Sequence, residues 1–179
     1  MATEILQKVG TPIVWAADGS AYDSSDSGYT QTNTITLNSL ADAAARQGDY
    51  ADLGATRAAQ YAVRAAIETA AAPTAGEAVY YYWSAATDAT AGYDGGCTGE
   101  DGAYKAGDEA EWVKQLQLIG VLTCTADTTG VVQTQTVGYF SPPTRYGAPV
   151  VWNECGQAFN AGDSTGMFLA LVPIVDESQ

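Results

Sequence analysis

Large and small side chains alternate along several stretches of this chain, and that period of two is typical of strands with one buried face. Residues 32–37, Thr-Asn-Thr-Ile-Thr-Leu, show the alternation most clearly. Gly, Asp, Ser and Pro separate such runs, as turns do between strands. The pattern predicts about eight strands, near residues 11–17, 32–37, 58–72, 79–83, 116–124, 131–140, 149–153 and 167–175.

The alanine-rich stretch 58–72 is the hardest to assign, because alanine favours a helix. Its larger side chains, Tyr61, Val63 and Ile67, nevertheless share one parity, which is the spacing of a strand. We therefore expect a strand here. A Pro-Thr-Ala-Gly turn then leads into the aromatic run 79–83, so a hairpin joining the two runs is also expected.

Only one segment carries the marks of a helix. In residues 38–48 an Asn or Ser stands before an alanine-rich run and Gly48 stands behind it, which predicts a short helix between the second and third strands. Farther along, a bend is expected at Gly120. Pro173 predicts an edge position or a strand end, while the apolar character of 167–175 places that strand in the middle of the molecule or against a neighbour.

Residues 84–107 are rich in Gly, Ala, Asp and Thr and are expected to form a long loop, with Tyr93 and Tyr104 as isolated anchors. The total of 179 residues suits one domain. Strands separated by turns, with no strand–helix alternation, predict a two-sheet sandwich or barrel. The expected fold is therefore a single all-β domain over residues 1–179.

The composition excludes several kinds of chemistry. The chain has no histidine, which rules out Ser-His-Asp and Cys-His catalysis and disfavours zinc. Cys97, Cys124 and Cys155 lack metal-binding spacing and are expected to be reduced, buried thiols, although one disulfide among them stays open. We expect no enzyme activity, no cofactor and no metal.

A net charge of −14 repels nucleic acid, and the seven basic residues are scattered, so no nucleic-acid partner is expected. The apolar runs are far shorter than the roughly 20 residues that a membrane helix needs. The start, Met-Ala-Thr-Glu, lacks the pattern of a secretory signal, and synthesis and folding in the cytoplasm are expected.

Acidic residues offer weaker candidates for chemistry. The loops 18–26, 94–101 and 108–111 have oxygen ligands of the kind that calcium prefers, but a solvated acidic loop is the simpler interpretation. Asp88 with Asp94, or Glu154 beside Trp152, are the best available carboxylates for cleaving a glycosidic bond. Nothing in the sequence distinguishes them from surface charge.

Contact residues are easier to nominate. Tyr93 and Tyr104 lie in the expected long loop, where tyrosine can anchor a partner or a sugar. Arg46, Arg57 and Arg145 are rare cations in an acidic chain. Each arginine suits either a local pair with a carboxylate or a contact between subunits, and the sequence leaves both interpretations open.

Four stretches of the chain resemble small structural proteins of tailed bacteriophages: residues 44–59 (AARQ to ADLGATRAA), 72–77 (APTAGE), 140–147 (FSPPTRYG) and 171–177 (LVPIVDE). The resemblance implies a jelly roll, so that with the strands and helix predicted above the expected fold is an eight-stranded jelly-roll-like two-sheet sandwich with one short helix. It further implies a capsid decoration, or cement, protein on the virion surface that forms a homotrimer and binds the major capsid protein. It carries no catalytic motif.

Two other functions remain as alternatives. One is a jelly-roll module of the phage tail, neck or fibre. The other is a carbohydrate-binding module, which the loop tyrosines and acidic loops favour.

Overall fold

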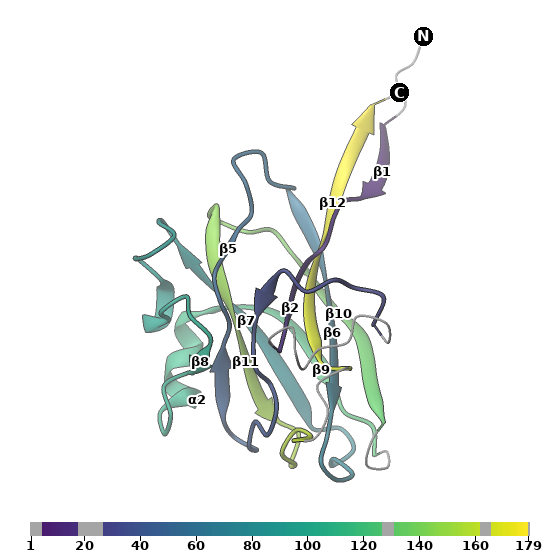
Figure 1. Cartoon of the computed structure of the whole chain (residues 1–179), viewed down its shortest axis with the longest axis vertical. Helices are drawn as coiled ribbons and strands as arrows, with labels where there is room; N and C mark the ends of the chain where they lie inside the picture. The colour runs from purple at the N-terminus through teal and green to yellow at the C-terminus, as the bar shows by residue number, and fades with distance from the viewer. Residues whose placement is uncertain (1–4, 18–26, 127–130, 162–165, 179) are drawn as a thin grey trace.

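The computed structural model describes residues 5–17, 27–126, 131–161 and 166–178, which fold into two facing β-sheets (Figure 1). The strands are β1 (Ile5–Val9), β2 (Ile13–Ala16), β3 (Asn33–Thr34), β4 (Ala45–Gln47), β5 (Ala51–Asp52), β6 (Gln60–Glu68), β7 (Ala78–Ala86), β8 (Gly102–Ala103), β9 (Gln117–Thr123), β10 (Val132–Phe140), β11 (Tyr146–Glu154) and β12 (Phe168–Ser178). The described helices are α2 (Glu109–Trp112) and the 3-10 turns η1 (Asp94–Gly96) and η2 (Val113–Gln115).

Sheet A has the order β10-β6-β12-β2-β3, and β1 pairs with the far end of β12. Sheet B has the order β8-β4-β11-β7-β9, and β5 pairs with β11. All of these pairs are antiparallel except β2 with β3. The expected all-β sandwich is confirmed, and every stretch expected to be a strand overlaps one. The described residues form twelve strands rather than about eight, because β1, β4, β5 and β8 lie outside the expected stretches.

The core lies between the sheets and is rich in aromatic rings. Trp15 on β2 meets Trp83 on β7 edge to face, with ring centres 5.9 Å apart, and Trp83 also packs on Phe140 of β10 at 5.5 Å. Both tryptophans are completely buried. Trp83 therefore joins its own sheet to two strands of the opposite one.

The strand expected in the alanine-rich stretch is confirmed as β6. Tyr61, Val63 and Ile67 point into the core, and β6 pairs with both β10 and β12. Burial of that face outweighs the helical preference of alanine. The expected hairpin between β6 and β7 is wrong, because β7 belongs to sheet B and pairs with β9 and β11. Both strands bury alternate residues in the same core, so they face each other across it.

The helix expected in residues 38–48 is also wrong. Ser39 and Ala43 have φ values of 58° and 61°, in the left-handed region that ends a helix, and β4 follows them. The side-chain amide of Asn153 on β11 donates to the carbonyls of Leu40 and Ala41, both at 3.1 Å. This tertiary contact fixes turns where local propensity favours a helix.

The bend expected at Gly120 is present as a β-bulge, because Ile119 has no partner between the pairs Tyr81–Gly120 and Tyr82–Leu118. The bulge reverses the parity of the strand. Ile119 is 3% exposed, whereas Leu118, which shares its parity in the sequence with the buried Leu122 and Cys124, is 50% exposed.

β12 lies in the middle of sheet A, as its apolar sequence indicates. Pro173 is inside this strand, so the expected edge or terminal position is wrong. Its carbonyl accepts the N–H of Gly10 at 2.8 Å. On the side of β12 that faces β1 and β2, the pairing strand changes from β2 to β1 at Pro173. The proline is tolerated because its missing N–H falls in this gap and interrupts no continuous ladder of hydrogen bonds.

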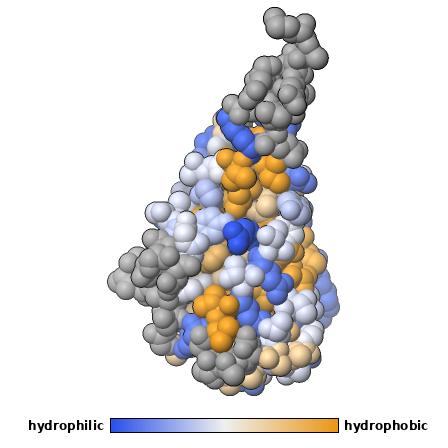
Figure 2. Space-filling model, turned by 90° about the vertical axis from the view of Figure 1, so that its right-hand side faces the viewer, coloured by the Kyte–Doolittle hydropathy of each residue, from blue (hydrophilic) through white to orange (hydrophobic). Residues whose placement is uncertain are grey.

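Beyond Pro173, β12 continues with β1 as a two-stranded ribbon that projects from the body and carries both ends of the chain (Figure 1). Val9, at the base of this ribbon, is 68% exposed. Figure 2 shows hydrophobic side chains gathered at the neck below the ribbon and again lower on the same face, with hydrophilic residues between them.

The expected loop 84–107 is shorter than predicted. Its first three residues finish β7, and β8 pairs with β4. The remainder, with α2 and η2, covers the outer face of sheet B in a second cluster that includes Cys97, Tyr104, Val113 and Val150. The three cysteines are free and buried. No helix in the described part of the chain is long and apolar enough to cross a membrane.

Candidate interaction surfaces

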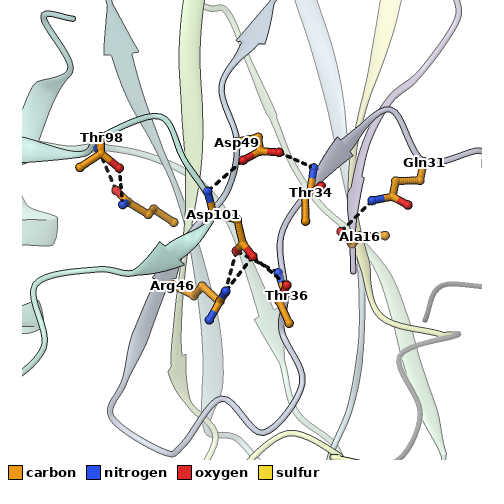
Figure 3. A network of polar contacts seen from close by, with 9 residues as sticks. Ala16, Gln31, Thr34, Thr36, Arg46, Asp49, Thr98 and Asp101 are labelled. Atoms are coloured by element: carbon orange, nitrogen blue, oxygen red, sulfur yellow. Dashed lines mark hydrogen bonds and ion pairs between the residues drawn. The ribbon is translucent and has the colours of Figure 1, made fainter. Parts of the chain in front are cut away.

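A polar network closes the open side of the sandwich beside β3, β4 and β8 (Figure 3). Asp101, just before β8, lies at its centre. Its carboxylate accepts both the N–H and the hydroxyl of Thr36, at 3.0 and 2.7 Å. The Nε and a terminal nitrogen of Arg46 on β4 donate to the same carboxylate at 2.7 Å each.

Asp49 extends the network across the sandwich. One carboxylate oxygen accepts the N–H of Asp101 at 2.9 Å, and the other accepts the N–H of Thr34 on β3 at 3.2 Å. The amide of Asn33 donates to the carbonyl of Tyr50 at 2.7 Å. Short strands at the margins of both sheets are thus held together by side chains rather than by a continuous ladder.

An open hollow of about 540 Å³ lies beside this network. Its lining is Gln31, Thr32, Asn33, Thr34, Asp49, Tyr50, Asp52, Gly99 and Glu100. The hollow is polar and acidic, but no group of three or more metal-binding side chains occurs among the described residues. Its carboxylates at Asp49 and Asp52 are already engaged by donors of the chain itself.

Two ion pairs lower the pKa values of carboxyl groups at this edge. Burial alone would raise the pKa of Asp101, but the Arg46 guanidinium and the donors of Thr36 outweigh it and lower that pKa. Arg145 donates two hydrogen bonds to Asp52, at 2.6 and 2.5 Å. This pairing lowers the pKa of Asp52 to about 2.

Replacing Asp101 by asparagine is expected to lower the free energy of unfolding at pH 7 by about 2–3 kcal/mol, because half-buried Arg46 loses a charge-assisted partner. Because the pKa of Asp101 is lower in the folded protein than in the unfolded chain, its ionised carboxylate stabilises the fold at pH values above the unfolded-state pKa. The contribution is lost as the pH falls below about 4 towards the folded-state pKa.

Urea unfolding of the wild type and D101N between pH 2.5 and 7 measures this difference. The gap between the two proteins should shrink as the pH falls. A gap that stays constant over this range would contradict the role assigned to the ionised carboxylate.

The nominated arginines prove to have different surroundings. Arg46 and Arg145 form bidentate pairs within the chain, with carboxylates distant in sequence. Arg57 is half-buried, and none of the ion pairs among the described residues includes it. The guanidinium of Arg145 also lies over the ring of Tyr146, 5.0 Å from its centre.

The two nominated tyrosines anchor the segment that covers sheet B. Tyr93 is half-buried and donates its hydroxyl to the carbonyl of Ala89 at 2.7 Å. Tyr104 is 1% exposed and donates to the carbonyl of Gly95 at 2.7 Å. Tyr104 therefore offers no surface to a partner in this conformation, and its nomination as a contact residue is corrected.

The acidic candidates form no group of three or more metal-binding side chains within the part of the chain that the structure describes. Asp88 is exposed and accepts the N–H and hydroxyl of Thr90, each at 2.9 Å, as a turn residue does. The acidic loop 18–26 lies outside the described residues. Burial, with Asp42 and Glu77 nearby, raises the pKa of Glu154, which lies on β11 two residues from Trp152.

Comparison with known proteins gives no relative. No family model, curated protein or solved structure matches this chain.

Two features with functional interest are absent from the sequence expectations. The projecting ribbon depends on the pairing of residues 5–9 with the end of β12, and no local pattern in the sequence predicts that pairing. Arg64 is marked in the sequence only by its parity, opposite to that of the core residues of β6. That parity does place it on the outer face of sheet A, where it meets Tyr29.

Proposed function

We propose that the sandwich is a jelly roll. Eight of the strands correspond to strands 1 to 8 of such a fold when they are numbered along the chain: β2, β4, β6, β7, β9, β10, β11 and β12. Sheet A then has the order 6-3-8-1 and sheet B the order 2-7-4-5. Strand 1 lies beside 8, 2 beside 7, 3 beside 6 and 4 beside 5, which is the arrangement produced when one long antiparallel hairpin rolls up.

We further propose that the protein is a non-enzymatic capsid decoration protein of a tailed bacteriophage, bridging neighbouring capsomers as a homotrimer. Jelly rolls are common in viral capsid proteins, although the fold alone does not determine function. The phage-like stretches of the sequence support the same assignment. The observation that carries the proposal is the projecting ribbon of β1 and β12.

A two-stranded ribbon is only marginally stable alone in water. Val9 is exposed at its base, and Ile174 and Val175 are only partly covered. Packing against a neighbouring subunit would bury this apolar surface and order the ribbon. The remaining surface, in a chain of net charge −14, suits a basic region of the major capsid protein.

Co-sedimentation with purified expanded capsids tests this function. The wild type should bind at a fixed ratio to the major capsid protein, and binding should weaken as salt rises, because exposed charges are screened. Absence of the protein from sedimented capsids, over a range of salt and protein concentrations, would contradict a role on the capsid.

Val9→Asp should reduce capsid binding at least tenfold while leaving thermal stability within about 0.5 kcal/mol of the wild type, since Val9 lies outside the core. Leu118→Asp is the matched control, because Leu118 is an exposed apolar residue on β9 of the opposite sheet. Equal losses of capsid binding in both variants would mean that the ribbon contributes no more to binding than the exposed surface of β9 does. Binding of the wild type to tails rather than capsids would favour a tail, neck or fibre module.

A second candidate, a carbohydrate-binding module, has one observation in its favour. Tyr80 and Trp152 form a cross-strand aromatic pair on the outer face of sheet B, with ring centres 5.6 Å apart, and both are partly exposed. Sugar rings stack on such surfaces. Glycan-array binding that disappears in Trp152→Ala would support this function, and no binding by the wild type would exclude the arrayed sugars.

A further inference from the structure

Arg64 lies on the outer face of sheet A, in the middle of β6, and is half-buried. One terminal nitrogen donates to the hydroxyl of Tyr29 at 3.0 Å, and the guanidinium carbon lies 5.7 Å from the centre of the same ring. The Nε atom is buried and has no hydrogen-bond partner within the described part of the chain.

The guanidinium of arginine stays ionised at every pH at which proteins fold. Arg46 and Arg145 each hold a carboxylate through two hydrogen bonds. None of the ion pairs among the described residues includes Arg64, although the chain has 21 acidic residues. A half-buried guanidinium with one phenol as its hydrogen-bond partner is poorly compensated, because burying a charge is costly unless an opposite charge meets it.

Arg64 also lines a hollow of about 330 Å³. The other lining residues are Ser27, Val132, Thr134, Gly166 and Phe168. Phe168 is buried, whereas Val132 and Thr134 on the neighbouring β10 are exposed. The hollow thus combines one cationic fork with hydroxyl groups and an apolar wall.

We propose that this hollow binds a carboxylate group attached to a short hydrocarbon chain, with the Arg64 guanidinium as its anchor. The planar fork of arginine matches the two oxygens of a carboxylate. The apolar wall at Val132 and Phe168 favours a ligand with methylene groups over a fully hydrated inorganic anion. Two sources present a carboxylate on a short hydrocarbon chain: an Asp or Glu side chain of a neighbouring copy, and a free dicarboxylate.

Glutarate is the probe, added to the full-length protein at constant ionic strength, with sodium chloride as the reference. Glutarate should raise the melting temperature of the wild type more than chloride does, because a ligand that binds the folded state stabilises it. It should also shift the NMR signals of residues that line the hollow.

Arg64→Gln should weaken glutarate binding at least tenfold, and Arg64→Lys should do so partly. Arg57→Gln is the control, because Arg57 is also half-buried but does not line the hollow. Without ligand, R64Q should be at least as stable as the wild type, since it removes a poorly compensated charge. A merely structural arginine would instead give a less stable variant.

Light scattering with and without glutarate distinguishes the two sources of the carboxylate. If the side chain of a neighbouring copy occupies the hollow, both glutarate and R64Q should reduce the mass of the oligomer. If the ligand is free, the mass should not change while glutarate still binds. The proposal is overturned if glutarate acts no differently from chloride, or if R64Q binds glutarate as well as the wild type does.

Discussion

Replacing Trp83 by alanine is expected to lower the free energy of unfolding by about 3–5 kcal/mol, the usual cost of removing a large buried aromatic ring. Trp83 is fully buried between the sheets and packs on Trp15 and Phe140 of the opposite sheet. The loss is a large part of the roughly 5–15 kcal/mol typical of a folded domain. Urea unfolding followed by far-ultraviolet circular dichroism measures it.

Trp112→Ala is the matched control. Trp112 is half-buried on α2, outside the main core, where Lys105 lies 4.4 Å from its ring centre. This variant should lose less than half as much stability. Equal losses at the two positions would mean that Trp83 does not lie at the junction of the two sheets.

Replacing Gly138 by alanine is expected to cost about 3 kcal/mol, at the upper end of the usual penalty for overpacking. A Cβ atom at Gly138 of β10 would come within 2.3 Å of the carbonyl oxygen of Ile119 on β9. That oxygen belongs to the backbone of the bulge and has little freedom to move. Gly120 is equally crowded, because a Cβ atom there would lie 2.4 Å from the side chain of Val137.

Gly102→Ala is the control for Gly138→Ala, because Gly102 also lies in a strand but has only the Gln47 amide within reach, at 3.9 Å. Its stability should change by no more than about 0.5 kcal/mol. Thermal unfolding of both variants compares them. A neutral Gly138→Ala would contradict the close approach of β9 and β10 that closes this side of the sandwich.

Alternation along the chain is enough to predict eight of the strands, including β6, because a side-chain period of two survives even where alanine dominates. It misses β1 and the short strands β4, β5 and β8. Tyr61 and Val63 mark the buried face of that strand directly. The same reasoning fails at Leu118, because one extra residue in the β9 bulge exchanges the two faces. Sequence alone indicates a bend at Gly120 but not the parity change that comes with it.

The remaining errors involve contacts between distant parts of the chain. Turns replace the expected helix in 38–48 because Asn153, more than 100 residues away, binds its carbonyls. The pairing of Arg46 with Asp101 spans 55 residues, so carboxylates nearer in sequence are the natural expectation. Assignment of β6 and β7 to opposite sheets likewise depends on the whole fold and not on the turn between them.

The interaction surfaces are predicted less well than the fold. Arg46 and Arg145 are occupied within the chain, and Tyr104 is buried. Residue type indicates which side chains suit an interface, but only the fold decides which of them are free to reach one. The ribbon and Arg64 become candidates through their position in the sheets.

The mass of the full-length protein in solution, measured by size-exclusion chromatography with light scattering, tests the proposed scaffold most directly. We expect about three times the chain mass of 18.6 kDa for the wild type and 18.6 kDa for Val9→Asp. A wild type that remains at 18.6 kDa even at high protein concentration would contradict the claim that the ribbon joins copies of this chain.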